Sequence, residues 1–469
     1  MQITKKDVAW NLGATVLKIA SGVIILPVIL KYLTADDVGV WTIFLSFSAI
    51  TLLFDFGFSA TFSRTITYIF SGANELYPRG FEITATGSEV NYALLKSTIK
   101  AMKWFYARIA LVILLFLLLG GTFYIRYVLE KSYSGDFKLI YLSWILYGII
   151  IAYQAYTLYF ESLLLGKGLV KRNKQIIVIS QLLFMIVSLF LLVYFRLGLL
   201  SLVIGQAVSV ITNRTLSYFT FYNHDTKEAL QSAGVISHKE ILRNISPNAI
   251  KIGITSLGSF LVNKSAVFVG SLFLPLPSIA TYGVSKQVVD MISAVSSIWF
   301  STYYPKIIQY RVNNKIERLK SLYVDSKIVY VVLFVLSGVV LVLFGNQLLS
   351  LIKTDTLLLS APLLILLLVV AFLENNHSIA GNILLTKNDV PFFKASILSG
   401  LLTVLLLILF LGNFKFGVIS LILAQGLAQL VYQNWKWPLE VIKELNITRK
   451  DYTDEMKKIM NKLWMFRLS

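Results

Sequence analysis

Two membrane-spanning segments and the turn between them are encoded by residues 7–64, which read DVAWNLGATVLKIASGVIILPVILKYLTADDVGVWTIFLSFSAITLLFDFGFSATFSR. The first segment, at about residues 10–30, is apolar apart from Asn11 and Lys18. Twenty helical residues at about 1.5 Å each cross a hydrocarbon layer of about 30 Å. A second, mostly apolar segment follows the turn and ends at Arg64. The stretch therefore predicts a helical hairpin in a membrane, and the rest of the chain repeats this pattern.

The composition of the whole chain is that of a polytopic helical membrane protein. Of its 469 residues, 57% are hydrophobic and only 14% are charged. The absence of cysteine excludes disulfides, thiol catalysis and cysteine-metal sites. The net charge of +19 is typical of a nucleic-acid-binding protein, but here the cations lie in loops between hydrophobic segments. That placement indicates membrane topology and no nucleic-acid partner.

Twelve membrane spans are predicted from hydropathy. They lie at roughly residues 10–32, 39–63, 104–127, 139–164, 174–195, 197–221, 246–273, 279–304, 325–351, 358–385, 391–413 and 416–438. The loops predicted to face outward hold only seven of the 43 lysines and arginines, namely Lys31, Arg126, Lys131, Lys138, Arg196, Lys353 and Lys415. Since cytoplasmic loops are enriched in these residues, the positive-inside rule places both termini in the cytoplasm.

An internal repeat divides the spans into two halves of six. The sequence LGLLSLVIGQ at residues 197–206 aligns with FGVISLILAQ at residues 416–425, with Gly, Ser and Gln types in the same order. Because six is even, both halves would enter the membrane from the same side, as in parallel-repeat transporters. The predicted architecture is an all-α membrane protein with two six-helix lobes around a central cavity. Its parts are an N-terminal lobe (1–221), a cytoplasmic linker (222–245), a C-terminal lobe (246–438) and a cytoplasmic tail (439–469).

Four lysines and one arginine are candidates for binding an anionic substrate in that cavity. Lys18, Lys251, Lys264 and Lys286 fall inside predicted spans, and Arg64 closes the second one. A charged side chain at lipid depth is costly and needs a partner, a cavity or a function. In a low-dielectric cavity, a lysine attracts a phosphate strongly. Alternatively, Lys251 extends to the interface and Arg64 is only an anchor at the cytoplasmic surface.

Four acidic residues and one histidine are candidates for ion coupling or for structural pairing. Asp55, Glu161, Asp290 and Glu374 lie in predicted spans, and His377 is the only one of three histidines that does. A buried, unpaired carboxylate has a raised proton affinity, which suits proton or sodium coupling. The structural alternatives are a position near a helix end for Glu161 and a hydrogen-bonded packing role for His377.

Two of the acids have a candidate partner in the sequence, and a third begins a polar run. Asp55 should lie at the depth of Lys18, and Asp290 follows Lys286 by four residues on one helical face. The run ENNHS at residues 374–378 places five consecutive polar residues inside a span. Such a run covers every face of a helix, so we expect it to be unwound, to face a cavity, or both.

The first hairpin resembles the opening of polysaccharide flippases, the O-antigen and related exporters of the multidrug/oligosaccharidyl-lipid/polysaccharide superfamily. The resemblance is carried by Asn11, Pro27, LTADDVGVW at residues 33–41 and FDFGFSATFSR at residues 54–64. It implies a bacterial inner-membrane protein that moves an undecaprenyl-pyrophosphate-linked repeat unit to the outer leaflet by alternating access. The implied partners are this polyprenyl-linked oligosaccharide, membrane lipid, a polysaccharide polymerase and chain-length proteins. Arg64 resembles the arginine after the family's second helix, which could meet the head group as it enters.

Three other classes of function remain open from the sequence. A cation-coupled multidrug exporter of the same superfamily would favour an acidic cavity, and here four deep lysines stand against four deep acids. A membrane enzyme of polysaccharide assembly would need a sizeable outer domain, and the longest predicted outer loop is short. A scaffold of the assembly complex is the third. No phosphate-binding glycine loop, metal-spaced cluster or nucleophile elbow is present, so we expect neither an enzyme nor a bound cofactor.

Overall fold

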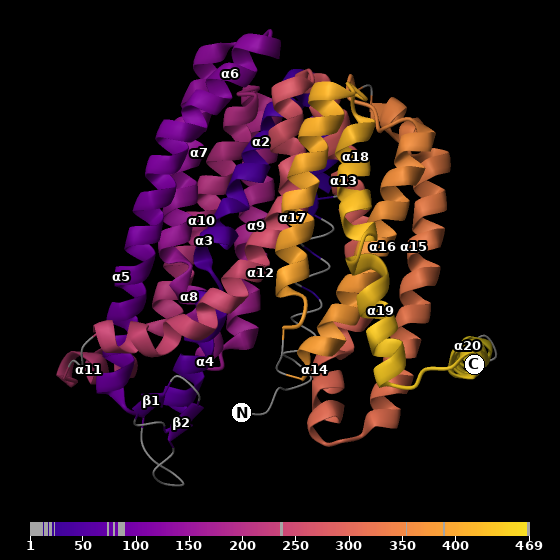
Figure 1. Ribbon diagram of the computed structural model, residues 1–469. Helices are drawn as coiled ribbons and strands as arrows, with labels where there is room; N and C mark the ends of the chain where they lie inside the picture. The colour runs from indigo at the N-terminus through magenta and orange to yellow at the C-terminus, as the bar shows by residue number, and fades with distance from the viewer. Residues whose placement is uncertain are drawn as a thin grey trace. The chain divides into compact units, whose positions relative to one another are not determined.

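The computed structural model of the protein describes residues 13, 17, 21–22, 24–72, 75–77, 80–82, 90–234, 238–352, 354–387 and 390–466. The chain forms two compact units, which we call unit 1 (Met1–Phe260) and unit 2 (Leu261–Ser469). Nearly all the described residues are helical, as Figure 1 shows. The predicted all-α polytopic fold is confirmed, with one addition. Strands β1 (Glu75–Tyr77) and β2 (Gly80–Glu82) pair antiparallel in the loop predicted at 65–103.

The helices of unit 1 run from α2 to the first part of α12. They are α2 (Ala35–Ser48), α3 (Ile50–Asp55), α4 (Phe58–Phe70), α5 (Tyr92–Phe116), α6 (Thr122–Ser132), α7 (Phe137–Thr157), α8 (Tyr159–Gly166), α9 (Val170–Phe190), α10 (Leu199–Phe221), α11 (His224–Ser232) and the first part of α12 (His238–Phe273). Short π-helical turns, η1 (Leu117–Gly121) and η2 (Leu191–Phe195), extend α5 and α9.

Unit 2 begins within α12 and continues through a second set of helices. They are α13 (Leu276–Ser296), α14 (Ile298–Val312), α15 (Ile316–Ile352), α16 (Ala361–Leu385), α17 (Phe393–Ile408) with its π-helical turn η3 (Leu409–Asn413), α18 (Ile419–Leu430), α19 (Gln433–Glu444) and α20 (Arg449–Phe466). In this unit α14 and α20 pack on α15, α16 packs on α19, and α17 packs on α18.

Among the described residues, nine helices are long and apolar enough to cross a membrane. They coincide with nine of the twelve predicted spans. The span predicted at 10–32 is described only in part. The spans predicted at 279–304 and 416–438 fall on the pairs α13–α14 and α18–α19, and each is interrupted inside the span. The interruptions lie at Ser297 and at Tyr432, whose φ of −144° leaves the helical region.

Several helices are longer than predicted because their first turns are polar. Helix α5 begins at Tyr92, whereas the predicted span begins at residue 104. Helix α15 begins at Ile316, whereas the predicted span begins at residue 325. Hydropathy reports only the lipid-depth part of a helix and misses such extensions. In unit 1 the strands and α11 lie at the end of the bundle where α5 begins, and the α6–α7 turn lies at the other end (Figure 1).

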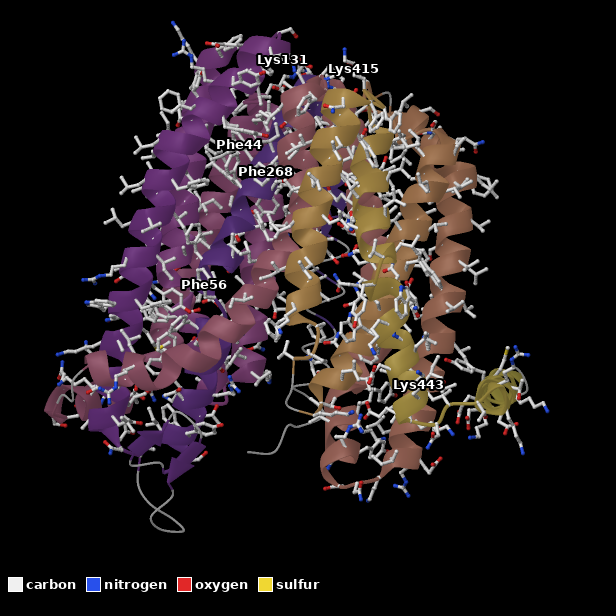
Figure 2. All side chains as sticks on the ribbon, in the orientation of Figure 1. Phe44, Phe56, Lys131, Phe268, Lys415 and Lys443 are labelled. Atoms are coloured by element: carbon white, nitrogen blue, oxygen red, sulfur yellow. The ribbon has the colours of Figure 1, made fainter. Side chains whose placement is uncertain are left out.

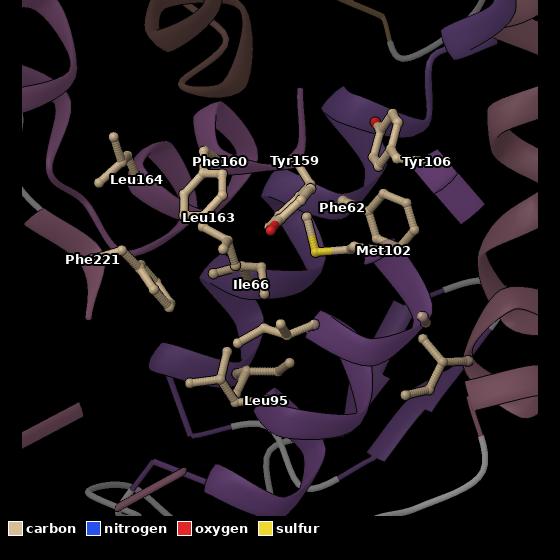
Figure 3. Packing of buried hydrophobic residues seen from close by; sticks show 14 of the residues in the cluster. Phe62, Ile66, Leu95, Met102, Tyr106, Tyr159, Phe160, Leu163, Leu164 and Phe221 are labelled. Carbon is tan, nitrogen blue, oxygen red and sulfur yellow. The ribbon is translucent and has the colours of Figure 1, made fainter. Parts of the chain in front are cut away.

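A hydrophobic core in unit 1 joins α4, α5, α8 and α10 (Figure 3). Phe62 and Ile66 of α4, Tyr106 of α5 and Tyr159 of α8 have no solvent-exposed surface. Inside a bilayer, burying such groups between helices adds little transfer free energy, because lipid is as apolar as leucine. Close packing and polar contacts therefore hold these helices together, and Tyr106 supplies one of those contacts.

A sharp break separates α3 from α4 in the FDFGFSATFSR motif. Phe56 and Gly57 both adopt left-handed conformations, with φ of 47° and 70°. Glycine tolerates this region and phenylalanine does so only at a cost, which the surrounding packing must offset. Figure 2 places Phe56 between the level of Phe44 and the end that carries the strands. The backbone of Gly253 on α12 lies close to Phe56, because a Cβ there would come within 2.7 Å of the Phe56 Cβ.

Candidate functional site

A group of four charged side chains in unit 2 forms the candidate site. Lys264 comes from α12, Lys286 and Asp290 come from α13, and Glu374 comes from α16. Lys264 interacts electrostatically with each of the other three. Three helices distant in sequence thus bring together four of the residues that the sequence analysis selected. We call this group the unit 2 charge cluster.

Lys286 and Asp290 form an ion pair within α13. They are four residues apart, so their side chains lie on one helical face. The Lys286 side chain is 15% exposed and that of Asp290 is 51% exposed. The predicted pairing is therefore present, and it removes Lys286 from the set of uncompensated amines.

Lys264 makes no hydrogen bond and no ion pair within the part of the chain that the structure describes. Its side chain is half-buried in a helix that is apolar enough to cross a membrane. An uncompensated ammonium group in such a place is costly unless an anion or water reaches it. Lys264 is thus the amine of the cluster that is best placed to bind an added negative group.

Glu374 is held by a carboxamide rather than by a lysine. Gln425 of α18, which is 1% exposed, donates from Nε2 to Glu374 Oε2 at 2.8 Å. The same Nε2 lies 3.4 Å from Oδ1 of Asn263, the residue before Lys264. An amide supplies no counter-charge, so this contact leaves the Glu374 carboxylate without an ion-pair partner in the described part of the chain.

His377 lies one turn along α16 from Glu374 and is 9% exposed. Its Nδ1 lies 2.8 Å from Oδ1 of Asn434 on α19. Of the two alternatives expected for residues 374–378, the unwound one is wrong, because α16 runs unbroken from Ala361 to Leu385. Polar partners on α18 and α19 accommodate this run inside the helical packing. The hydrogen-bonded alternative for His377 is the one that the structure shows.

Asp55 of unit 1 caps the helix that follows the α3–α4 break. Its two carboxylate oxygens accept the Ser59 backbone N–H at 3.2 Å, and Tyr106 donates its hydroxyl to Oδ1 at 2.6 Å. The side chain is 8% exposed. These bonds satisfy an otherwise orphaned backbone donor at the start of α4 and tie it to α5. Its predicted partner Lys18 lies outside the described residues.

The remaining predicted residues belong to unit 1. Arg64 is exposed on α4 and contacts Thr61 Oγ1 at 3.4 Å. Glu161 is exposed on α8 and interacts electrostatically with Asp55. The side chain of Lys251, on α12, lies outside the described part of the structure. Within the described residues no group of three or more His, Cys, Asp or Glu could hold a metal ion.

Lys103 and Arg214 are among the cations that the sequence analysis did not select. Arg214 lies in the polar run TNRT at residues 212–215, inside the span predicted at 197–221. This polar run inside a predicted span was the sequence feature that could have identified Arg214. Lys103 was assigned to a loop, whereas it lies within α5.

No protein-family model matches this chain, and no curated protein matches it. Solved structures do match its fold. An inward-facing multidrug resistance MATE family transporter of the MOP superfamily aligns with a TM-score of 0.65 and 12% identity over 92% of this chain and 94% of that one. The lipid II flippase MurJ, in an inward closed conformation, aligns with a TM-score of 0.63 and 13% identity over 98% and 92%.

An outward-facing MATE family transporter of the MOP superfamily aligns with a TM-score of 0.55 and 14% identity over 96% of this chain and all of that one. At such low identity the likeness concerns the fold. The chain therefore has the two-lobed helical fold of MOP-superfamily transporters.

Proposed function

We propose that this protein is a flippase that moves a lipid-linked oligosaccharide of the undecaprenyl-pyrophosphate type across the bacterial inner membrane. Its repeat units would serve O-antigen or another surface polysaccharide and would pass to a polymerase and its chain-length proteins. The observation that carries the proposal is the amine of Lys264, which has no hydrogen-bond or ion-pair partner among the described residues, in a helix of membrane-crossing length. The similarity in fold to a protein named as a lipid II flippase supports it.

The chemistry of the unit 2 charge cluster suits an acidic head group. A pyrophosphate carries negative charge on several oxygens, and a lysine binds it as a mobile point charge. Asp290 is engaged in an ion pair with Lys286, whereas Lys264 lies near Asp290 and Glu374 without forming an ion pair with either in the described part of the chain. Desolvation strengthens such an attraction, because the interaction energy rises as the local dielectric falls. The polyprenyl tail would stay in lipid while the head group moves by alternating access.

A cation-coupled multidrug exporter is the second candidate, and Glu374 favours it. This carboxylate accepts a hydrogen bond from the amide of Gln425. No cation in the described part of the chain lies within hydrogen-bond distance of it. A cationic drug would use that negative charge. Both candidates place the chemistry in the same cluster, so the two substitutions Lys264→Ala and Glu374→Gln separate them.

The test uses a deletion strain that produces the full chain, with Lys264→Ala compared with wild type and with Lys227→Ala, an exposed control on α11. With protein levels matched, we expect Lys264→Ala to reduce surface glycan at least tenfold and to accumulate the lipid-linked intermediate. Lys227→Ala should behave as wild type. Normal glycan in Lys264→Ala would remove this residue from the site.

The exporter is tested in the same strains by drug sensitivity. If deletion leaves glycan normal and raises sensitivity to cationic drugs, and Glu374→Gln reproduces that sensitivity, the flippase proposal fails. If deletion lowers glycan and leaves drug sensitivity unchanged, the exporter is excluded.

A further inference from the structure

Arg214 is a charged side chain at membrane depth that the proposed transport site does not use. It lies seven residues before the end of α10, which is about 10 Å along the helix axis. Its Nη2 donates to Tyr159 Oη at 2.8 Å, and its guanidinium carbon lies 3.3 Å from the ring centre of Phe160. Its Nη1 is buried without a hydrogen-bond partner in the described part of the chain. The hydroxyl of Tyr159 and the rings of Tyr159 and Phe160 thus hold the guanidinium, and no carboxylate among the described residues forms an ion pair with it.

A second cation approaches the same aromatic surface from α5. The exposed Lys103 has its Nζ 6.0 Å from the ring centre of Tyr222, and that ring lies 6.3 Å from Phe160. The charges of Lys103 and Arg214 repel each other. Neither forms an ion pair with a carboxylate among the residues that the structure describes. Two cations therefore flank one aromatic platform without a counter-charge.

This arrangement is costly without an anion. Like charges at low dielectric repel, and a buried guanidinium donor without an acceptor loses the hydrogen bonds that it makes in water. A phosphate would satisfy both cations at once. Arginine matches its oxygens with a planar fork of donors, and a lysine adds a flexible point charge.

Exposed apolar side chains lie on α7 and on α10, the helix that carries Arg214. On α7, Ile145, Ile149 and Tyr153 repeat at intervals of four residues and are 44%, 49% and 38% exposed. On the neighbouring α10, Ile211 and Tyr218 are 56% and 41% exposed and lie on the same stripe as Arg214. Exposed apolar side chains in a membrane-crossing helix contact acyl chains. The surface thus joins a hydrocarbon-binding stripe to a cationic end.

We propose that Arg214 and Lys103, with Tyr222 between them, bind the phosphate of an anionic phospholipid whose acyl chains lie along α7 and α10. The lipid comes from the leaflet at the α11 end of unit 1, where lysine and arginine side chains at the interface attract acidic head groups. The site lies wholly within unit 1 and does not depend on the proposed transport substrate.

The test titrates the purified full-length protein in detergent with phosphatidylglycerol and counts bound lipids by native mass spectrometry. The variant is Arg214→Gln, and the matched control is Arg172→Gln, an exposed arginine on α9 at the same end of unit 1. We expect Arg214→Gln to lower the affinity for one bound phosphatidylglycerol at least about tenfold. This is the scale of one lost charge-assisted hydrogen bond. Arg172→Gln should bind as wild type does, and phosphatidylcholine should not reproduce the tight adduct.

Equal affinity in wild type and Arg214→Gln would overturn the proposal. If Arg214→Gln does not fold, Lys103→Gln carries the same test, because its side chain is exposed and packs in no core. Undecaprenyl phosphate is added as a competitor in a further arm. If it displaces phosphatidylglycerol from the wild type at a lower concentration, the surface belongs to the substrate lipid and the phospholipid assignment is wrong.

Discussion

At the scale of single residues, the hydrogen bonds of Asp55 all serve a structural role. Its carboxylate accepts from the Ser59 backbone and from Tyr106 at the break between α3 and α4. A group engaged in this way stabilises a particular backbone path. Lys264 differs, because no described residue bonds its amine. The two residues were comparable candidates in the sequence, and only their partners separate them.

We predict that Asp55→Ala lowers stability by about 1–3 kcal/mol, the sum of a lost helix cap and a lost buried hydrogen bond. Thermal unfolding of the detergent-solubilised protein measures it. Tyr106→Phe removes only one of the bonds and should cost less. Asp55→Asn keeps a capping oxygen and should retain most of the stability. If Asp55→Asn is stable and inactive in transport, the charge of Asp55 has a role beyond capping.

At the scale of elements, α20 is attached to α15 by polar contacts. Lys320 Nζ lies 2.9 Å from Asp451 Oδ2, and Ser321 donates to Glu455 Oε1 at 2.6 Å. The hydrogen bond from Lys320, with those from Thr448, lowers the pKa of Asp451 to about 2. The sequence analysis assigned these residues to a cytoplasmic tail at 439–469. The structure shows a helix, and two of its side chains bond α15.

The attachment of α20 should weaken in acid. A carboxyl group whose pKa is lowered on folding stabilises the folded state above its unfolded pKa, and that contribution is lost as pH falls through the folded value. For Asp451 the loss occurs between about pH 4 and pH 2. At neutral pH, Asp451→Asn should mimic protonation of this carboxylate and increase proteolytic cleavage before α20. Asp454→Asn, an exposed neighbour, is the control, and equal cleavage of both variants would contradict this role of Asp451.

At the scale of the whole molecule, the orientation of the helices in the membrane follows from the loop charges. The absence of cysteine makes this directly measurable, because a single introduced thiol is the only one in the chain. We expect Lys138→Cys, at the α6–α7 end of unit 1, to react with a membrane-impermeant maleimide on intact spheroplasts. Ser232→Cys, on α11, should react only after the membrane is opened. The reverse labelling would invert the predicted topology.

The sequence by itself determined the helical membrane fold, nine of the spans and the Lys286–Asp290 pair. These depend on short-range properties: hydrophobic length sets a span, and a spacing of four places two side chains on one helical face. The hydrogen bond from Tyr106 to Asp55 and the helicity of residues 374–378 could not be predicted in this way. Both depend on partners more than 50 residues away, Tyr106 for Asp55 and Gln425 and Asn434 for the polar run.

The grouping of Lys264 with Glu374, and of Lys103 with Arg214, was decided only by tertiary structure. Hydropathy reports how deep a residue lies and carries no information about which helices are neighbours. Helix packing sets those neighbours, and it therefore decides whether a buried charge is paired, capped or left to bind a ligand.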